Sequence, residues 1–361
     1  MSGDEKLQHI RAQIDELDLQ IQDLINRRAL AAKEVAKIKL EEDKDAFFYR
    51  PEREAAILKK IQCRNKGPMG DEEMARLFRE IMSACLALEQ PLKIAYLGPE
   101  GTFTQSAALK HFGHSIITLP LGSISDVFQE VESGAAQYGV VPVENSTEGV
   151  INHTLDMFLR SPLFICGEVG LRIHHHLLSM ETDATTITKV FSHQQSLAQC
   201  RGWLDRNLPS AEQVTVGSNA EAARLAARES RSAAIAGEMA AELYHLKGLA
   251  RNIEDEPDNT TRFLVIGRQK ALSSGDDKTS ILCATRNVAG GLGRLLAPLA
   301  EHGISMTRIE SRPSRQGNWD YVFFIDIEGH QDDPKVASAL EALQEQARLL
   351  KILGSYPKAV L

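Results

Sequence analysis

The sequence predicts a multidomain chain in which three domains of different class follow one another. An all-α domain of three helices comes first, a two-lobed α/β domain second, and a small α+β domain last. Three observations support this order: helical periodicity over the first 90 residues, alternating strand and helix patterns in the middle, and a βαββαβ pattern at the end. Turn-forming clusters at 89–91 and 273–277 separate the three, which gives domains over 1–90, 92–270 and 278–355.

The composition excludes several classes of protein. The chain has 361 residues, of which 43% are hydrophobic, and a net charge of −8, which argues against a nucleic-acid partner. No apolar run reaches the roughly 18 residues of a membrane span, and the N-terminus lacks a signal-peptide core, so we expect a cytoplasmic protein without a membrane partner. Its five scattered cysteines form no CxxC pair, and neither a metal nor another cofactor is expected.

Residues 7–40 are predicted to form one long helix, because they contain neither glycine nor proline. A helix of this length spans about 50 Å, which two short helices cannot cover. A second copy of the chain is the simplest partner, so we expect a homodimer or a higher homo-oligomer. Two shorter helices should follow over 51–64 and 71–89. The apolar residues of the long helix follow a heptad seam: Leu7, Ile10, Ile14, Leu17, Ile21, Leu24, Ala31, Val35 and Ile38.

Charged residues interrupt or flank this seam. Arg28 occupies a seam position, where an unpaired guanidinium would cost several kcal/mol, so an anion should meet it. Lys39 lies about three turns further on and points the same way, and Arg11 shares the register of Lys39. In a crossed or antiparallel dimer, Arg11 could come from the partner chain. The alternative is that Arg11 and Lys39 are solvated while Arg28 pairs with an internal carboxylate. Glu89 projects from the apolar face of the third helix, although a frayed helix end would also explain it.

This pattern resembles the three-helix, intertwined-dimer chorismate mutases. The resemblance implies that the cations bind the two carboxylates of chorismate, while Lys39 and Glu89 address the ether oxygen that departs in the rearrangement. Arg50 stands where many members have Asp, and Glu89 stands where many have Gln. Because a carboxyl donates a hydrogen bond only when protonated, we expect burial to raise the pKa of Glu89 and mutase activity to fall as pH rises. The implied site residues are Arg11, Arg28, Lys39, Arg53, Glu54 and Glu89.

The middle segment predicts two α/β lobes that enclose a cleft, with mostly parallel sheets, although one larger lobe is an alternative. Four strings rich in Gly, Ser, Thr and Asn lie at strand ends: GPEGTFT at 98–104, PVENSTEG at 142–149, SHQQSLAQC at 192–200 and TTRF at 260–263. Each alone fits turn and cap chemistry. Together they resemble prephenate dehydratase, whose fold is periplasmic-binding-protein-like. The resemblance implies that Glu144, Asn145, Gln195 and Thr261 lie in the cleft, with Thr261 as proton donor to the departing hydroxyl.

Two other chemistries are disfavoured in this segment. Three consecutive histidines, 174–176, cannot all reach one metal ion from a strand, because neighbouring side chains point to opposite faces. Thiol catalysis at Cys200 has no supporting motif.

The last segment has the βαββαβ order of a ferredoxin-like unit and resembles the ACT domain of bifunctional mutase–dehydratases. Two stretches carry the resemblance, one at a strand-to-helix turn and one at the end of the next strand. An isolated Gly-Gly would only permit the turn. The resemblance implies a phenylalanine site at a subunit interface formed by Asn287, Ala289, Gly290, Gly291, Leu292, Glu310, Ser311, Arg312 and Pro313.

Taken together, the three segments predict an enzyme of phenylalanine biosynthesis. It would convert chorismate to prephenate, decarboxylate and dehydrate prephenate to phenylpyruvate, and respond to L-phenylalanine as an effector. Two alternatives remain: a non-catalytic regulator that binds aromatic precursors, or an enzyme that keeps only the dehydratase activity.

Overall fold

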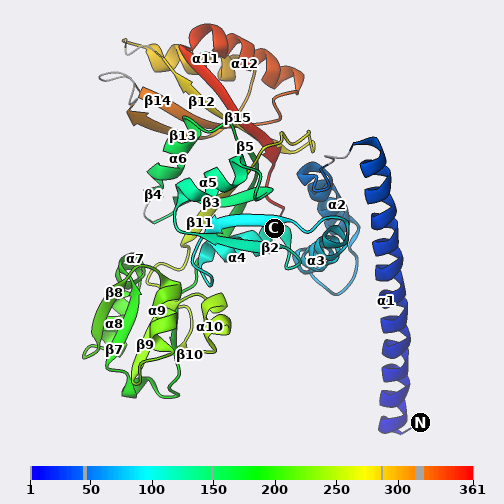
Figure 1. The fold of residues 1–361 in the computed structure, drawn as a ribbon, viewed down its shortest axis with the longest axis vertical. Helices are drawn as coiled ribbons and strands as arrows, with labels where there is room; N and C mark the ends of the chain where they lie inside the picture. The colour runs from blue at the N-terminus through cyan, green and yellow to red at the C-terminus, as the bar shows by residue number, and fades with distance from the viewer. Residues whose placement is uncertain (1, 44–46, 148, 286–287, 314–320, 361) are drawn as a thin grey trace.

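A computed structural model describes residues 2–43, 47–147, 149–285, 288–313 and 321–360. Three helices, two α/β lobes and an α+β unit follow one another along the chain, as the sequence predicts. Figure 1 shows the two lobes and the α+β unit stacked in a column, with the helices at its side.

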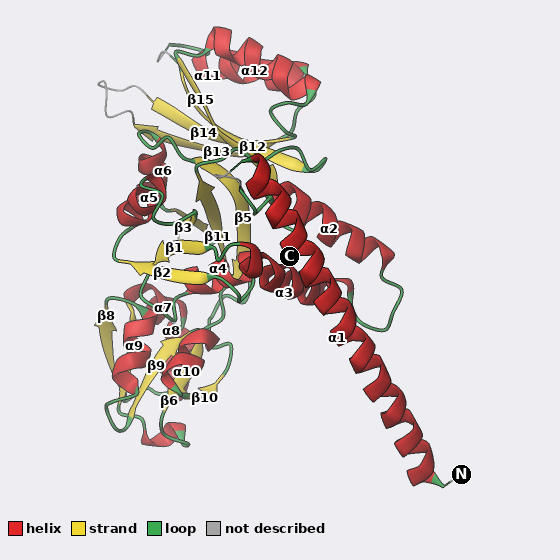
Figure 2. Ribbon diagram, turned by 45° about the vertical axis from the view of Figure 1, so that its right-hand side comes forward, coloured by secondary structure: helices red, strands yellow, loops and turns green. Residues whose placement is uncertain are grey.

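The helical part consists of α1 (Gly3–Glu42), α2 (Pro51–Arg64) and α3 (Asp71–Glu89). The Ser2 hydroxyl accepts a hydrogen bond from the Glu5 backbone N–H, and the Glu5 carboxylate accepts one from the Ser2 N–H, so a capping box starts α1. The N-terminal half of α1 projects away from the rest of the chain (Figure 2). Its apolar seam is therefore open to solvent, with side chains from Leu7 to Leu24 about half exposed.

The first lobe is built on a six-stranded sheet in the order β2-β1-β3-β11-β5, with β4 beside β3. Only the pairs that β1 makes with β2 and β3 are parallel, while β11 runs antiparallel to both β3 and β5. The strands are β1 (Lys93–Leu97), β2 (Ile117–Leu121), β3 (Tyr138–Asn145), β4 (Gly149–Val150), β5 (Phe164–Arg172) and β11 (Thr260–Gly267). The helices are α4 (Phe103–Phe112), α5 (Ile124–Glu132) and α6 (Asn152–Phe158).

The second lobe contains a five-stranded sheet in the order β10-β6-β9-β7-β8. Here too β7 is parallel to β8 and β9, whereas β6 is antiparallel to β9 and β10. The prediction of mostly parallel sheets was wrong, because the chain crosses between the lobes twice and the first strand after each crossing, β6 or β11, runs antiparallel to both of its neighbours. The elements are β6 (His176–Ser179), a 3-10 turn (Ala184–Thr186), β7 (Lys189–His193), α7 (Gln194–Gln199), α8 (Arg201–Asn207), β8 (Glu212–Val216), α9 (Asn219–Ala226), β9 (Ser232–Ala236), α10 (Glu238–Tyr244) and β10 (Lys247–Ala250).

The last unit has a four-stranded sheet in the order β13-β14-β12-β15, with the predicted βαββαβ connectivity. One face of the sheet packs on its own two helices, and Leu282, Phe324 and Tyr356 on the other face share a core with the first lobe. Gly354 lies so close to the backbone of Ile165 that any Cβ there would collide with the Ile165 carbonyl. The elements are β12 (Asp277–Ala284), α11 (Gly291–Glu301), β13 (Met306–Pro313), β14 (Tyr321–Glu328), α12 (Pro334–Gln346) and β15 (Leu349–Pro357).

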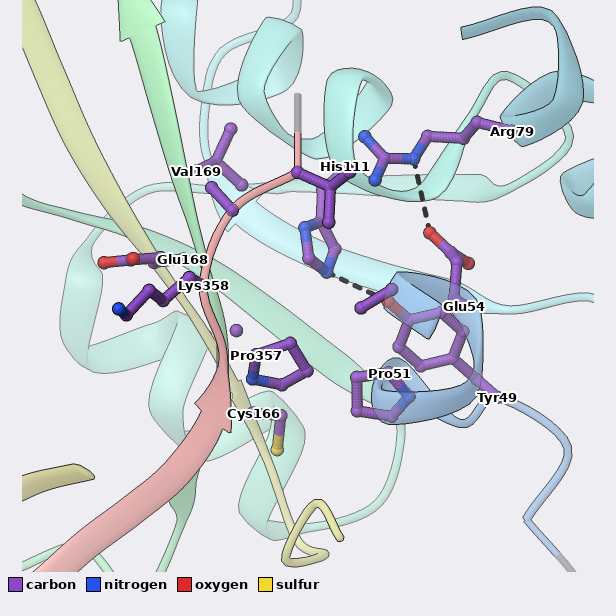
Figure 3. Close-up of a pocket in the computed structure, with 14 residues that line it drawn as sticks. Tyr49, Pro51, Glu54, Arg79, His111, Cys166, Glu168, Val169, Pro357 and Lys358 are labelled. Atoms are coloured by element: carbon purple, nitrogen blue, oxygen red, sulfur yellow. Dashed lines mark hydrogen bonds and ion pairs between the residues drawn. The ribbon is translucent and has the colours of Figure 1, made fainter. Parts of the chain in front are cut away.

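All three units meet near the C-terminus. Figure 3 shows Tyr49 hydrogen-bonded to His111 of α4 (3.0 Å) and Glu54 of α2 paired with Arg79 of α3 (3.2 Å). Arg79 also donates to the Lys110 carbonyl at 2.8 Å, so this buried pair ties both helices to the first lobe. Beyond β15 the chain reaches the helices, where Val360 packs against the cluster formed by Leu58, Ala75 and Met82.

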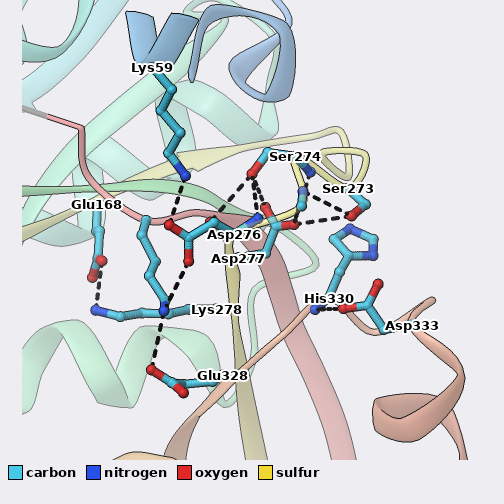
Figure 4. A network of polar contacts seen from close by, with 12 residues as sticks. Lys59, Glu168, Ser273, Ser274, Asp276, Asp277, Lys278, Glu328, His330 and Asp333 are labelled. Carbon is cyan, nitrogen blue, oxygen red and sulfur yellow. Dashed lines mark hydrogen bonds and ion pairs between the residues drawn. The ribbon is translucent and has the colours of Figure 1, made fainter. Parts of the chain in front are cut away.

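Salt bridges reinforce this junction. Lys59 of α2 binds Asp276 at 2.8 Å (Figure 4), and Lys358 binds Asp276 at 3.0 Å and Glu328 at 3.1 Å. Arg262 of the first lobe pairs with Glu168 of the same lobe (2.9 Å) and with Asp326 of the α+β unit (2.6 Å).

Candidate active sites

The first candidate site is a cavity of about 310 Å³ between the C-terminal third of α1, the first turns of α2 with the segment before it, and α3. It brings together three of the predicted cations, Arg28, Lys39 and Arg53, and also Glu89. Ala31, Val35, Ile57, Met82 and Leu86 supply the apolar wall. A cavity that gathers several cations suits a compact dianion.

The electrostatics of this cavity centre on Lys39 and Glu89. Burial raises the pKa of the Glu89 carboxyl above its ordinary value, and the nearby charges of Lys39 and Arg28 only partly oppose this. Burial also lowers the pKa of Lys39, against the attraction of Glu89. The Lys39 ammonium lies 5.5 Å from the centroid of the Phe48 ring and donates to the Phe47 carbonyl at 3.4 Å. The expected rise in the Glu89 pKa is therefore present in the structure.

Two predicted residues lie apart from this group. Arg11 is exposed on α1, 17 residues or about 26 Å along the helix from Arg28, so it cannot reach the cavity of its own chain. Glu54 borders the cavity, but its carboxylate accepts a hydrogen bond from Arg79 of α3, which is not among the residues that line the cavity. The charge of Glu54 is thus already compensated by a buried guanidinium, and the action of Glu54 on substrate stays a prediction.

The second candidate site is the cleft between the two lobes, with a volume of about 950 Å³. Gly98, Thr102 and Thr104 of the first string line one wall, and His193 of the third string lines the other. Ser218 and Asn219 add the N-terminus of α9, whose backbone N–H groups favour an anion. The predicted two-lobed cleft is therefore present.

A buried polar network lies where the two lobes join. The side-chain amide of Asn145, at the end of β3, donates to the Thr261 hydroxyl at 2.8 Å and to Asn259 at 2.9 Å. Asn259 in turn donates to Gln199 at 3.1 Å, and Gln199 lies 2.9 Å from Nε2 of His175. Sequence analysis singled out Asn145 and Thr261 but missed the other three. Gln199 and Asn259 lie in or beside the quoted strings, yet no spacing rule shows that these strings meet.

Glu144 and Gln195 depart from the expected grouping. Glu144 pairs with Arg308 of β13 at 2.9 Å and so faces the α+β unit, not Thr261. The reason is strand geometry: Thr261 is opposite Asn145, Arg262 is opposite Glu144, and successive pairs point to opposite faces of the sheet. Gln195 is exposed on the first turn of α7, in the second lobe. The structure therefore joins Asn145 to Thr261 and leaves Glu144 and Gln195 apart from them.

The predicted effector residues also divide into two groups. Gly290, Gly291 and Leu292 line a cavity of about 220 Å³ together with Tyr321 and Phe323 of β14. Gly290 has φ +75° and starts α11, a conformation that favours glycine. Ala289 is exposed in the same turn, and Asn287 lies outside the described residues.

The second effector stretch runs along β13, which forms the edge of its sheet. Arg312 pairs with Asp156 of α6 at 2.8 Å, and Glu310, Ser311 and Pro313 are its neighbours on the strand. Among the described residues, the second stretch does not line the cavity around Gly290.

The remaining motifs have local partners. His174 pairs with Glu254 at 2.8 Å, His176 accepts from the Asn252 N–H at 3.1 Å, and no group of three or more candidate metal ligands occurs in the described part of the chain. Burial raises the pKa of the Cys200 thiol well above its ordinary value, which disfavours a thiolate. None of the helices described here is long and apolar enough to span a bilayer.

These sites define a class of protein: a multidomain enzyme that combines a cationic cavity among helices, a separate two-lobed centre and an additional ligand-sized cavity. The family descriptions "Chorismate mutase type II", "Prephenate dehydratase" and "ACT domain" match residues 10–90, 94–271 and 279–345. A bifunctional chorismate mutase/prephenate dehydratase from Stutzerimonas stutzeri is 60% identical over the full length of both chains. The chain belongs to the family of bifunctional chorismate mutase/prephenate dehydratases.

Two solved structures are similar to about three quarters of this chain. A prephenate dehydratase from Arthrobacter aurescens in complex with L-Phe is 33% identical, with a TM-score of 0.68 over 74% of this chain and 90% of that one. A protein described as GqqA, a novel type of quorum quenching acylase, is 30% identical, with a TM-score of 0.69 over 74% of this chain and 98% of that one.

Proposed function

We propose that the cavity between α1, α2 and α3 is the mutase centre, and that Arg28, Lys39, Arg53 and Glu89 act there on chorismate. The observation that carries this assignment is the convergence of the three cations and a carboxyl of raised pKa on one half-apolar cavity. Arg28 and Arg53 bind the carboxylates of the substrate. Lys39 and protonated Glu89 stabilise the charge that builds on the ether oxygen as its bond to carbon breaks.

The dehydratase centre is assigned to the interlobe cleft and the network at its hinge. Thr261 gives a proton to the departing hydroxyl of prephenate, and Asn145 supports Thr261 through their 2.8 Å hydrogen bond. Gln195 is assigned to substrate binding from the second lobe, because His193 beside it already lines the cleft. Glu144 would act on substrate only if it released Arg308, so its assigned role is to join the dehydratase and ACT domains.

The mutase centre is assigned to a homodimer, in which Arg11 of one chain completes the cavity of the other. The exposed seam from Leu7 to Leu24 supports this assignment, because a row of half-exposed leucines and isoleucines is the surface that a second helix covers. Sedimentation of the purified chain tests it, and a monomer at micromolar concentration would contradict it.

L-Phenylalanine is the proposed effector, and the cavity around Gly290 and Leu292 is its proposed site. The cavity of about 220 Å³ has aromatic walls at Tyr321 and Phe323, which fit a phenyl ring. The Arthrobacter aurescens relative is described as a complex with L-Phe. Gly293 also lines the cavity, so Gly293→Val should weaken phenylalanine binding measured by calorimetry, with L-alanine as the control ligand.

The cytoplasm is the proposed location. Cys85, Cys166, Cys200 and Cys283 are buried as free thiols, which is typical of proteins from a reducing compartment.

One experiment tests the whole assignment. Purified protein is supplied with chorismate, then separately with prephenate, while substrate loss and phenylpyruvate formation are followed with and without phenylalanine. We expect both substrates to be consumed and phenylalanine to slow phenylpyruvate formation. Binding without turnover would contradict the assignment and favour a regulator, and turnover of prephenate alone would show a chain that keeps only the dehydratase activity.

A further inference from the structure

The buried network at the hinge has a defined direction of hydrogen bonding. The Thr147 backbone N–H donates to Oδ1 of Asn145 at 3.0 Å, and a backbone N–H can only donate. The amide nitrogen of Asn145 must therefore face Thr261 and Asn259, to which it lies 2.8 and 2.9 Å away. Consequently the Thr261 oxygen accepts a hydrogen bond, and its own proton is directed elsewhere.

The donor and acceptor atoms of the other residues in the network follow in the same way. Because Oδ1 of Asn259 accepts from Asn145, its amide nitrogen donates to Oε1 of Gln199 at 3.1 Å. That oxygen is also 2.9 Å from Nε2 of His175, so this ring nitrogen carries the proton and donates. Nδ1 of His175 then has no proton, and it is buried without a hydrogen-bond partner among the described residues.

The network is held where the lobes connect. The chain passes between the lobes through 173–175 and 251–259, and the Ile173 N–H donates to the Asn259 carbonyl at 2.8 Å. The Ile253 N–H donates to the His175 carbonyl at 2.9 Å, so the two connections are hydrogen-bonded to each other. Asn259 and His175 are only 2% and 1% exposed. The His175 ring also meets Phe103, which lines the cleft, with 5.6 Å between ring centroids.

We propose that His175, Gln199 and Asn259 are positioning residues of the dehydratase, which hold the Asn145 amide so that it donates to the Thr261 oxygen. The inference rests on the proposed role of Thr261 as proton donor. A hydrogen bond accepted at this oxygen stabilises the negative charge that develops as the proton leaves, which is how an ordinary alcohol becomes a useful acid here.

The reaction step balances as follows. The bond between the ring and the departing carboxylate breaks, carbon dioxide leaves, and the electron pair enters the ring. The ring aromatises as the carbon–oxygen bond breaks, and the oxygen takes the Thr261 proton and departs as water. A solvent water then gives a proton to the threonine oxygen and leaves as hydroxide, and no oxidant or reductant is needed. A reversed Asn145 amide would instead accept the Thr261 proton and hold it away from the substrate.

The test is a double-mutant cycle on the full-length enzyme, with the mutase activity of the same chain as an internal measure of folding. Thr261→Val should lower the dehydratase kcat about a hundredfold or more, as for loss of a general acid. Asn259→Leu should lower kcat about tenfold with KM changed less than about threefold, because one supporting hydrogen bond is lost. In the Thr261→Val background, Asn259→Leu should change kcat less than about twofold, since its effect acts through Thr261.

Histidine variants provide the conservative rescue and the control. His175→Leu should behave like Asn259→Leu, whereas His175→Gln keeps an N–H donor and should recover most of the lost kcat. His174→Gln is the matched control. The His174 ring pairs with Glu254, which accepts a hydrogen bond from the backbone N–H of His175 and from none of the described side chains of the network, so this variant should leave the dehydratase rate unchanged.

The outcomes separate the two levels of the proposal. If Thr261→Val leaves kcat unchanged, the proposed proton donor is wrong, and the positioning role falls with it. If Thr261→Val lowers the dehydratase kcat while Asn259→Leu and His175→Leu retain full kcat, only the positioning role is overturned. If Asn259→Leu has the same effect in the unchanged chain and in the Thr261→Val background, or if mutase activity falls equally, the residue has a general structural role. Either result also overturns the positioning role.

Discussion

The two proposed catalytic centres of this chain use opposite electrostatic designs. The mutase cavity relies on formal charges, Arg28, Lys39 and Arg53, on half-buried or exposed side chains. The dehydratase network uses neutral amides, an imidazole and a hydroxyl, with Asn259, Thr261 and His175 all less than 10% exposed. Charged side chains can act in an open and adaptable cavity. Neutral groups act only when they are correctly oriented, so they need a closed one.

The two centres also differ in completeness. Every member of the dehydratase network comes from one chain, although from four separate segments of it. The mutase cavity lacks Arg11, which lies about 26 Å along α1 from Arg28. A charged site on a long exposed helix can thus be shared between two chains, while an oriented network is better held inside one domain.

Loss of a mutase cation should produce the largest effect. Lys39→Ala removes the charge proposed to face the breaking ether bond, so mutase kcat/KM should fall about a hundredfold to a thousandfold. Dehydratase turnover of added prephenate should stay within about twofold, because the centres share no residue. Both rates are measured on the same preparation, and Lys37→Ala on the exposed side of α1 is the matched control. A parallel fall in both activities would refute the separation of the two centres.

Sharing of Arg11 predicts complementation between inactive chains. Arg11→Ala and Arg28→Ala should each be nearly inactive as a mutase alone. If each cavity takes Arg11 from the partner, one cavity of every mixed dimer keeps both arginines. After equal mixing and subunit exchange, about a quarter of the wild-type mutase activity should return, since about half of the dimers are mixed. Mixing without any recovery, although mixed dimers are detected by mass spectrometry, would contradict the shared cavity.

The sequence predicted one centre better than the other for a physical reason. Arg28, Lys39 and Glu89 lie on long helices, where periodicity alone determines which residues share a face. Asn259 and Gln199 meet only because two lobe crossings run side by side, and no local pattern encodes that contact. For the same reason the order of elements was predicted correctly, while the antiparallel crossings and the opposite facing of Glu144 were not.

Glu89 offers a smaller and pH-dependent effect. Its carboxyl donates a hydrogen bond only when protonated, and burial raises its pKa. Mutase kcat should therefore be highest at low pH and fall as pH rises through this raised pKa, by about tenfold between about pH 5 and 9. Glu89→Gln keeps an N–H donor at every pH and should flatten the profile. The dehydratase rate of each sample, which does not involve Glu89, corrects for general effects of pH. A flat profile for the unchanged chain would disprove the role of the proton.

The smallest expected effect concerns the tail that links the ACT domain to the mutase helices. Val360 packs on Leu58, Ala75 and Met82, so Val360→Ala should cost the helices about 1 kcal/mol of stability. Lys59→Met breaks a partly exposed ion pair with Asp276 and should cost less than about 1 kcal/mol. Because neither residue touches the dehydratase network, heating should inactivate the mutase of Val360→Ala before its dehydratase, as measured by residual activity. Simultaneous loss of both activities on heating would contradict this and show that the helices and the first lobe unfold as one cooperative unit. The buried Glu54–Arg79 pair, which contacts the first lobe, would then be the link between them.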